Sequence, residues 1–330
     1  MRTRKLGTSG FAVSEIGFGT WGIGGYVAGA SYGATDDRQS LAALRKAADL
    51  GIDFFDTADA YGDGHAETLL GQAFGAGYDN IVVATKAGHP RFGGPQDFSP
   101  AHLRRSVEGS LGRLKRARID LLQLHNPPIE LLQAQPEILA CLFDLQRAGK
   151  IAAWGLSLKT PAEAKIAIDA FAPVCVQANF NLADQRALDI GLLDRARDAG
   201  VAVIARTPLA FGFLSGTLAA DATFPEGDHR RNWPAERIRQ WAAAGRALAG
   251  ELAARDGQSL AQIALRFCLS HPAVATAIPG MLGEAEVVQN AAASDLGPLA
   301  DADVARIRAN YAASAFAGTK IETPKTPGRV

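Results

Sequence analysis

The chain has 330 residues, of which 48% are hydrophobic, and its 34 Lys and Arg residues balance 34 Asp and Glu residues. This apolar content excludes a disordered chain, and the length allows one large domain or two of ordinary size. A net charge of zero gives no electrostatic footprint for nucleic acid or an anionic membrane, so we expect a small-molecule partner. No stretch approaches the roughly 18 apolar residues of a membrane span, and no apolar signal segment follows Met1, which predicts a cytoplasmic protein.

Cysteine and histidine spacing gives no sign of a metal site. Cys141, Cys175 and Cys268 are widely spaced and none belongs to a CxxC pair, so neither a disulfide framework nor a zinc site is expected. His65 and His89 have no carboxylate or cysteine at ligand spacing. We therefore predict that the protein binds no metal.

The predicted elements begin with a hairpin over residues 3–13, which turns at Thr8-Ser-Gly. Behind it, short runs rich in apolar and β-branched residues alternate with longer amphipathic segments. The eight strand-like runs begin at Ile16, Phe54, Ile81, Ile119, Ala152, Val174, Val201 and Val274. The clearest helical segments cover residues 37–49, 100–114, 135–148, 161–170 and 184–199.

Alternation of strand and helix predicts parallel strands joined by right-handed crossovers. Eight units of one size favour a closed (β/α)8 TIM barrel over an open doubly wound sheet, and no linker divides the chain. We predict one α/β domain over residues 1–330. The irregular segment 217–234 after the seventh strand is long and polar, as lids over active sites often are.

The functional residues of such a barrel lie at the carboxyl ends of its strands. Here the second strand is followed by Asp56 and Tyr61, the third by Lys86, and the fourth ends in His125. This order resembles the catalytic tetrad of the aldo-keto reductase superfamily. The resemblance extends over nearly the whole chain, from Gly17-Phe-Gly-Thr-Trp through Phe55-Asp-Thr-Ala-Asp-Ala-Tyr-Gly to Ile278-Pro-Gly.

The resemblance implies hydride transfer between a nicotinamide cofactor and a carbonyl or alcohol group. The developing alkoxide needs a proton donor, and a free tyrosine with a pKa of about 10 is a poor one at neutral pH. A neighbouring lysine cation lowers that pKa. Carried over to this chain, Tyr61 is the general acid or base and Lys86 tunes it, while Asp56 anchors the lysine and His125 orients the carbonyl. Each residue alone has an ordinary structural role open to it, but the four together favour catalysis.

For the cofactor, the resemblance implies contacts from the ends of the first, fifth, sixth, seventh and eighth strands. Ser157 and Gln177 suit the nicotinamide carboxamide, which both donates and accepts hydrogen bonds; the alternative for Gln177 is a core amide. The predicted cofactor residues are Gly19, Thr20, Trp21, Asp56, Ser157, Gln177, Arg206, Thr207, Pro208, Leu209, Gly212, Leu214, Ser215, Ile278, Pro279, Gly280, Met281, Glu286, Gln289 and Asn290.

Substrate contacts are expected from aromatic side chains and the tetrad, because aromatic walls suit flat carbonyl compounds and sugar rings. The predicted substrate residues are Trp21, Tyr26, Tyr61, Phe92, His125 and Trp233. For Trp233, packing on its own loop is the alternative.

The chain departs from the family's pattern in three ways. Leu158 stands where an asparagine commonly follows the serine of the fifth strand, and Arg206 replaces an aromatic residue that stacks on the nicotinamide. A guanidinium plane also stacks, but its positive charge opposes that of the oxidised nicotinamide ring and so favours the reduced cofactor.

The third departure lies after Pro279-Gly280, where there is no basic residue to bind a 2′-phosphate; Glu284 and Glu286 stand there instead. The family pattern favours NADP(H), and this local chemistry favours NAD(H). The alternative is that both glutamates serve the first turn of the last barrel helix.

The sequence thus predicts an NAD(P)-dependent oxidoreductase acting on an aldehyde, ketone or lactol. An NAD-linked aldose or pyridoxal dehydrogenase is the alternative enzyme. A cofactor-binding, redox-sensing regulatory subunit, like the channel β subunits that resemble this family, is the alternative from another class, and a barrel with isomerase or aldolase chemistry is a third. No stretch marks a subunit interface, so a monomer and a homo-oligomer both stay open.

Overall fold

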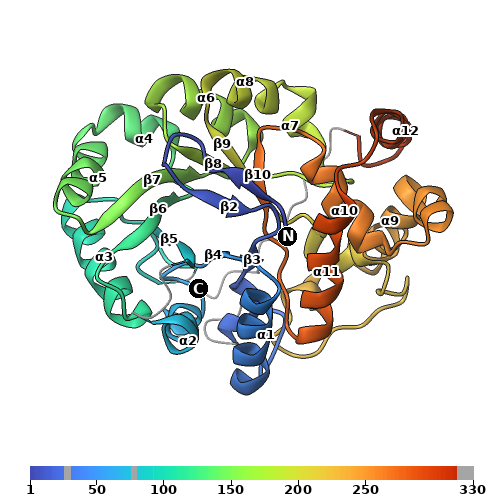
Figure 1. The fold of residues 1–330 in the computed structure, drawn as a ribbon, viewed down its shortest axis with the longest axis horizontal. Coiled ribbons are helices and arrows are strands. Elements are labelled where there is room, and N and C mark those ends of the chain that lie inside the picture. The colour runs from blue at the N-terminus through green and yellow to red at the C-terminus, as the bar shows by residue number, and fades with distance from the viewer. Residues whose placement is uncertain (26–30, 76–79, 92, 318–330) are drawn as a thin grey trace.

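The computed structural model describes residues 1–25, 31–75, 80–91 and 93–317. Eight parallel strands lie side by side and are ringed by helices (Figure 1). In spatial order the strands are β3 (Phe18–Gly19), β4 (Phe54–Asp56), β5 (Val82–Ala87), β6 (Ile119–His125), β7 (Ile151–Ser157), β8 (Cys175–Asn179), β9 (Ala202–Arg206) and β10 (Val274–Ala277). Parallel bridges from Ile16 to Ala277 and from Gly19 to Gly280 join the first strand to the last. The predicted (β/α)8 barrel is confirmed.

The outer ring consists mainly of helices that follow the barrel strands. They are α1 (Asp37–Asp49), α2 (His65–Phe74), α3 (Pro100–Leu114), α4 (Ile129–Ala134), α5 (Glu137–Arg147), α6 (Pro161–Phe171), α7 (Arg186–Asp189), α8 (Leu192–Ala199), α9 (Ala235–Asp256), α10 (Leu260–Leu269), α11 (Glu284–Leu296) and α12 (Asp301–Ala312). Within the described ranges, three 3-10 helices lie in the connections: η1 (Trp21–Gly24), η2 (Ala210–Ser215) and η3 (His229–Asn232). None of the helices in the described ranges is both long and apolar enough to cross a membrane.

Local chemistry fixes where several helices begin and end. The Ser99 hydroxyl accepts from the backbone N–H of His102, and Pro100 occupies the first turn of α3. Thr160 and Glu163 form a capping box that starts α6. The helix predicted over residues 184–199 is wrong as a single element, because Gly191 with φ 69° separates α7 from α8.

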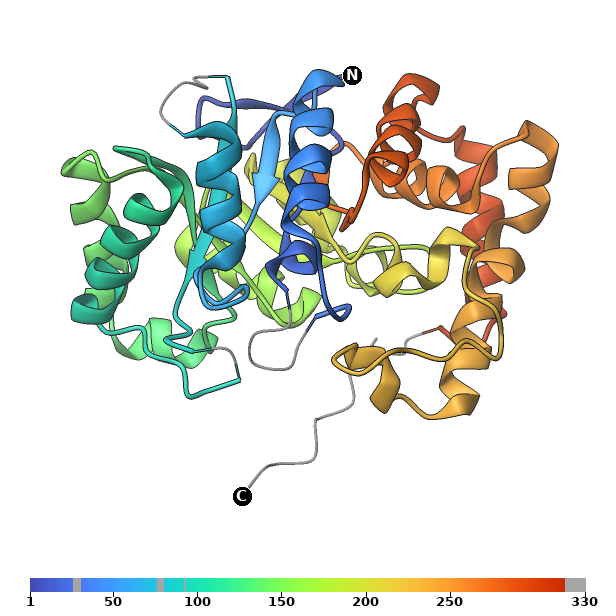
Figure 2. The same cartoon turned by 90° about the horizontal axis from the view of Figure 1, so that it is seen from below.

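Apolar side chains fill the barrel interior at the end that the amino-terminal hairpin covers. Each comes from an inward-facing strand position, and together they form one buried cluster: Phe54, Ala84, Leu121, Ala153, Cys175, Ile204 and Ala275. The predicted amino-terminal hairpin is confirmed by the pairing of β1 (Thr3–Lys5) with β2 (Ala12–Ser14). Leu6 and Val13 of the hairpin are fully buried in the same cluster, so the hairpin closes the base of the barrel. In the side view the blue hairpin and the gold segment around residue 230 lie at opposite ends (Figure 2).

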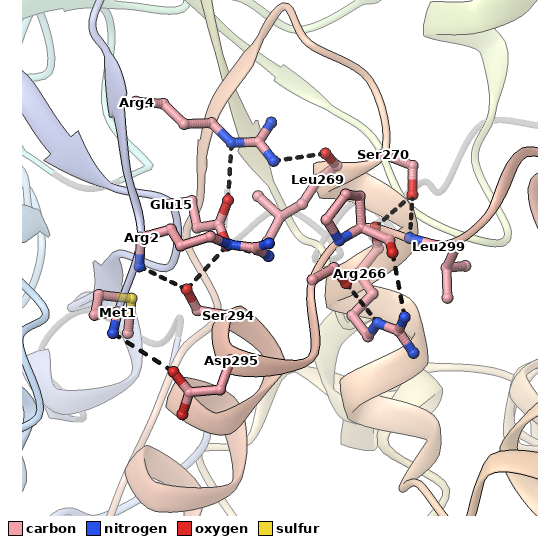
Figure 3. Close-up of polar contacts among 12 residues, drawn as sticks. Met1, Arg2, Arg4, Glu15, Arg266, Leu269, Ser270, Ser294, Asp295 and Leu299 are labelled. Carbon is pink, nitrogen blue, oxygen red and sulfur yellow. Dashed lines mark hydrogen bonds and ion pairs between the residues drawn. The ribbon is translucent and has the colours of Figure 1, made fainter.

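A buried carboxylate fastens the base of the barrel to its last helices. Glu15, with 1% of its surface exposed, accepts from Arg2, from Arg4 and from the hydroxyl of Ser294 on α11 (Figure 3). The Arg4 guanidinium reaches on to the carbonyls of Leu269 and Val274. One carboxylate therefore links the hairpin, the start of the first strand and the carboxyl-terminal helices.

The Glu15 network predicts a large loss of stability when its charge is removed. Glu15→Gln keeps the shape but leaves two arginines without their shared partner, so we expect the free energy of unfolding to fall by about 2 to 4 kcal/mol. Urea denaturation followed by circular dichroism measures it. Glu236→Gln breaks an exposed ion pair with Arg239 and should cost less than about 1 kcal/mol. Equal costs for the two variants would contradict the prediction.

Candidate active site

A buried ion pair forms the floor of the site. Asp56 is the last residue of β4, Lys86 lies on the neighbouring β5, and both side chains are almost fully buried. The Lys86 Nζ donates to Asp56 Oδ1 at 2.5 Å, to the Thr57 carbonyl at 2.8 Å and to Tyr61 Oη at 3.1 Å. All three ammonium hydrogens therefore have acceptors, and one of these acceptors is a phenol.

Two buried amides hold the other oxygen of Asp56. Gln123 Nε2 and Gln177 Nε2 donate to Asp56 Oδ2 at 3.1 Å and 2.7 Å, and Gln177 also donates to Gln123 Oε1. Gln177 was predicted to contact the cofactor, yet its amide nitrogen binds this carboxylate. Gln123 was missed, although it lies two residues before His125 on the same strand and so faces the same side.

Tyr61 and His125 meet above this floor. Their rings are perpendicular, with centroids 5.9 Å apart. Burial raises the pKa of the Tyr61 phenol, while the Lys86 and Arg206 cations oppose that rise. The predicted influence of Lys86 on the tyrosine is present, but burial works against it. Burial and the nearby Lys86, His89 and Arg206 hold the pKa of His125 well below its usual range, so its imidazole is neutral.

The pKa of Lys86 is governed by opposing effects. Burial lowers it, but the Asp56 carboxylate and the Tyr61 phenol raise it above the ordinary lysine value. The ammonium therefore stays charged beside the phenol at neutral pH, and it stabilises a phenolate if Tyr61 gives up its proton.

Arg206 is fixed at the end of β9 by four acceptors. Its Nε donates to Asn179 Oδ1, its Nη1 to Asn126 Oδ1 and Ser157 Oγ, and its Nη2 to the Leu158 carbonyl, over distances of 2.7 to 3.2 Å. Ser157 in turn donates to Gln177 Oε1 at 3.3 Å. The buried Leu158 side chain brings no polar group here, and the guanidinium joins Ser157 to the surrounding polar side chains.

The segment after β9 has an unusual backbone. Thr207, Ala210 and Phe211 take φ values of 52°, 47° and 58°. Such conformations cost about 1 to 3 kcal/mol each and persist mainly at functional sites. The predicted cofactor residues Pro208, Leu209, Gly212, Leu214 and Ser215 belong to this same strained loop.

Predicted residues of the first and eighth strands also come together. Gly19 donates its backbone N–H to the Pro279 carbonyl at 2.9 Å, and Thr20 Oγ1 donates to the Asp56 carbonyl at 3.0 Å. Ile278, Met281 and Asn290 are buried, and the Gln289 carbonyl accepts from Gln262. Glu286 accepts from the Leu282 N–H at 2.6 Å, so one of its oxygens serves the start of α11.

Outside the tetrad, two of the aromatic residues predicted to contact substrate, Trp21 and Trp233, lie within the described residues. Trp21 lies edge-on to Tyr32 and His229, with centroids 5.0 Å and 4.9 Å away. Trp233 is only 4% exposed, and its ring stacks on that of Phe213 with centroids 5.3 Å apart. This packing agrees with the alternative for Trp233, a structural role in its loop. Tyr26 and Phe92 lie outside the described residues. No group of three potential metal ligands occurs in the ranges that the structure describes.

The Aldo/keto reductase family model matches residues 15–312. The chain belongs to this family. It is 33% identical over 292 residues to aldo-keto reductase YhdN of Bacillus subtilis, covering 85% of each chain, and 29% identical to a probable voltage-gated potassium channel subunit beta of rice, covering 92% of this chain and 94% of that one. The glycerol dehydrogenase of Gluconobacter oxydans has a similar structure, with a TM-score of 0.78 and 28% identity over 95% of this chain and 96% of that one. The protein is therefore an NAD(P)-dependent oxidoreductase, as predicted.

This aldo/keto reductase should keep His125 neutral over the physiological range. We expect its ring-proton magnetic resonance signals, assigned by their loss in His125→Gln, not to titrate between about pH 5.5 and pH 8. Because the folded-state pKa lies below the unfolded value of about 6.5, the stability from this group is present above that pH and is lost as the pH falls toward the folded-state pKa. Lys86→Met removes a nearby cation and should raise the pKa of His125. A wild-type signal that titrates near pH 6.5 would contradict the assignment.

Proposed function

We propose that the protein interconverts an aldehyde, ketone or lactol with its alcohol, with Tyr61 as general acid and base. The contact of Lys86 Nζ with both Asp56 Oδ1 and Tyr61 Oη supports this most directly. In reduction, Tyr61 gives its proton to the carbonyl oxygen, and in oxidation the phenolate takes it back. Lys86 stabilises the phenolate, and Asp56 holds Lys86 in place.

His125 orients the substrate in this proposal. A neutral imidazole has one N–H, which donates to the oxygen that becomes the alkoxide. The bound nicotinamide supplies a hydride in reduction and accepts one in oxidation. The similarity to a glycerol dehydrogenase supports including the oxidative direction.

The described residues fit a bound dinucleotide. Backbone groups at Gly19 and Gly280 lie together at the rim, and Gly280 is exposed to solvent there. The N–H groups of Ala210, Gly212 and Leu214 already donate to carbonyls of the strained loop, so its remaining N–H groups would be the ones to hold phosphates. Ser157 and Arg206 would meet the nicotinamide end.

Tyr61→Phe tests the proton transfer. We expect the turnover number for glyceraldehyde reduction to fall about 10²- to 10⁴-fold, because the phenyl ring has no proton to give, while affinity for NADH stays within about twofold. Tyr311→Phe, on the distant α12, is the control and should keep its activity.

Unchanged turnover in Tyr61→Phe would contradict the proposed mechanism. The alternative function is a redox-sensing regulatory subunit, and the similarity to a probable potassium channel subunit beta supports testing it. Slow turnover of the wild-type protein on every carbonyl tested, with a partner retained in stoichiometric amount, would favour that rival.

We further propose a preference for NAD(H), because Glu284 and Glu286 begin α11 where a 2′-phosphate would need a cation. Fluorescence titration with NADH and NADPH at one ionic strength should give a dissociation constant roughly tenfold lower for NADH, about 1.4 kcal/mol. Glu286→Gln should narrow that difference, whereas Glu251→Gln on α9 should leave it unchanged. Tighter NADPH binding would contradict the preference. Whether Arg206 favours the reduced cofactor is tested by comparing the affinities for NAD⁺ and NADH in the wild-type protein and in Arg206→Tyr; an unchanged ratio would contradict it.

A further inference from the structure

Gln96, in the connection between β5 and α3, has one side-chain nitrogen in contact with the site's histidines. Its Nε2 lies 3.0 Å from the His125 carbonyl, 3.0 Å from the Asn126 carbonyl and 3.1 Å from His89 Nε2. Carbonyl oxygens only accept, so the nitrogen faces them and shares its two hydrogens among the three contacts. The contact with His89 then requires that His89 present an unprotonated Nε2.

Gln96 binds the backbone of the turn at His125 and Asn126, where β6 ends. Asn126 takes φ 57°, a left-handed conformation that a residue with a side chain adopts at a cost. Its N–H donates to the Ser157 carbonyl at 2.7 Å, and its Oδ1 accepts from Arg206. Gln96 binds the two carbonyls of this turn from the opposite loop. The position of the His125 backbone therefore depends on a side chain that the family tetrad does not include.

The ring of His125 lacks the support that functional histidines usually have. A hydrogen bond to the second ring nitrogen normally fixes the orientation of the imidazole. Here His125 Nδ1 is buried and has no hydrogen-bond partner among the residues that the structure describes. Ring packing takes that place: His89 lies edge-on to His125, with centroids 4.7 Å apart at 76°, and Tyr61 packs on it at 83°.

We propose that Gln96 and His89 form a positioning pair that sets the orientation of His125 toward the substrate carbonyl. Gln96 fixes the backbone behind His125 and also holds the His89 ring against the His125 ring. Both residues act through His125, and neither donates or accepts the transferred proton. The inference rests on the proposed function, because it matters only if His125 orients the substrate.

Gln96→Met removes the donor at similar side-chain length and tests the pair. We expect turnover of glyceraldehyde to fall about 10- to 100-fold, the range for a small misplacement of a reacting group, with NADH affinity and thermal stability nearly unchanged. Gln135→Met is the matched control. Gln135 borders the same surface groove of about 370 Å³ but has no described contact with His125, and we expect full turnover.

The His125→Ala background separates positioning from a general structural role. If Gln96 acts through His125, Gln96→Met should cause no further loss of turnover once the imidazole is absent. For His89, a positioning role by packing predicts that His89→Phe retains most of the turnover and His89→Ala does not. Equal turnover in these two variants, whether full or reduced, would show that ring packing by His89 does not position His125, which overturns this part of the proposal.

The remaining outcomes also decide between explanations. Full turnover in Gln96→Met, or an equal further loss in the His125→Ala background, overturns the positioning pair. A parallel loss of NADH affinity would show general damage to the rim and overturns it as well. If Tyr61→Phe and His125→Ala are themselves fully active, the proposed function has failed. If their turnover falls to a low but measurable rate while Gln96→Met keeps full turnover, only the positioning pair has failed.

Discussion

The ion pair between Lys86 and Asp56 is the interaction on which the site depends. Burying either charge alone would cost several kcal/mol, so each requires the other and the hydrogen bonds around it. Gln123 and Gln177 donate the remaining hydrogen bonds to the Asp56 carboxylate. The Thr57 carbonyl and the Tyr61 phenol accept the remaining hydrogen bonds of the Lys86 ammonium. The barrel interior therefore changes from apolar to polar between successive inward-facing positions, two residues apart, from Phe54 to Asp56 on β4 and from Ala84 to Lys86 on β5.

The positive charges of Lys86 and Arg206 lie close enough to affect the ionisation of the Tyr61 phenol. Burial alone would leave the Tyr61 proton hard to remove, and the nearby cations reduce that cost. The same cations, together with burial, keep His125 neutral. One set of positive charges thus favours ionisation of the Tyr61 phenol and disfavours protonation of the His125 imidazole.

The strands could be predicted because the periodicity of apolar residues is a local property of the sequence. Asp56, Tyr61, Lys86 and His125 were singled out in a different way, by the resemblance of their order along the chain to the family's tetrad. Contacts between side chains from different loops could not be predicted. Gln96 is one polar residue in an irregular segment, and nothing near it in sequence shows that its amide reaches the end of β6. For Gln177 the sequence predicts a cofactor contact or a core amide, and it does not show the hydrogen bonds to Asp56 and Gln123, which lie on other strands.

The closure between Ile16 and Ala277 has a consequence for synthesis of the protein. The first strand leaves the ribosome long before its neighbour on the far side, so the ring stays open while most of the chain is made. Until β10 emerges, β3 and β9 present unpaired strand edges, which are templates for association with other chains. Glu15 and its arginines must likewise wait for Ser294. The stage at which a nascent chain is most exposed to misassembly therefore lasts at least until β10 and Ser294 have been synthesised.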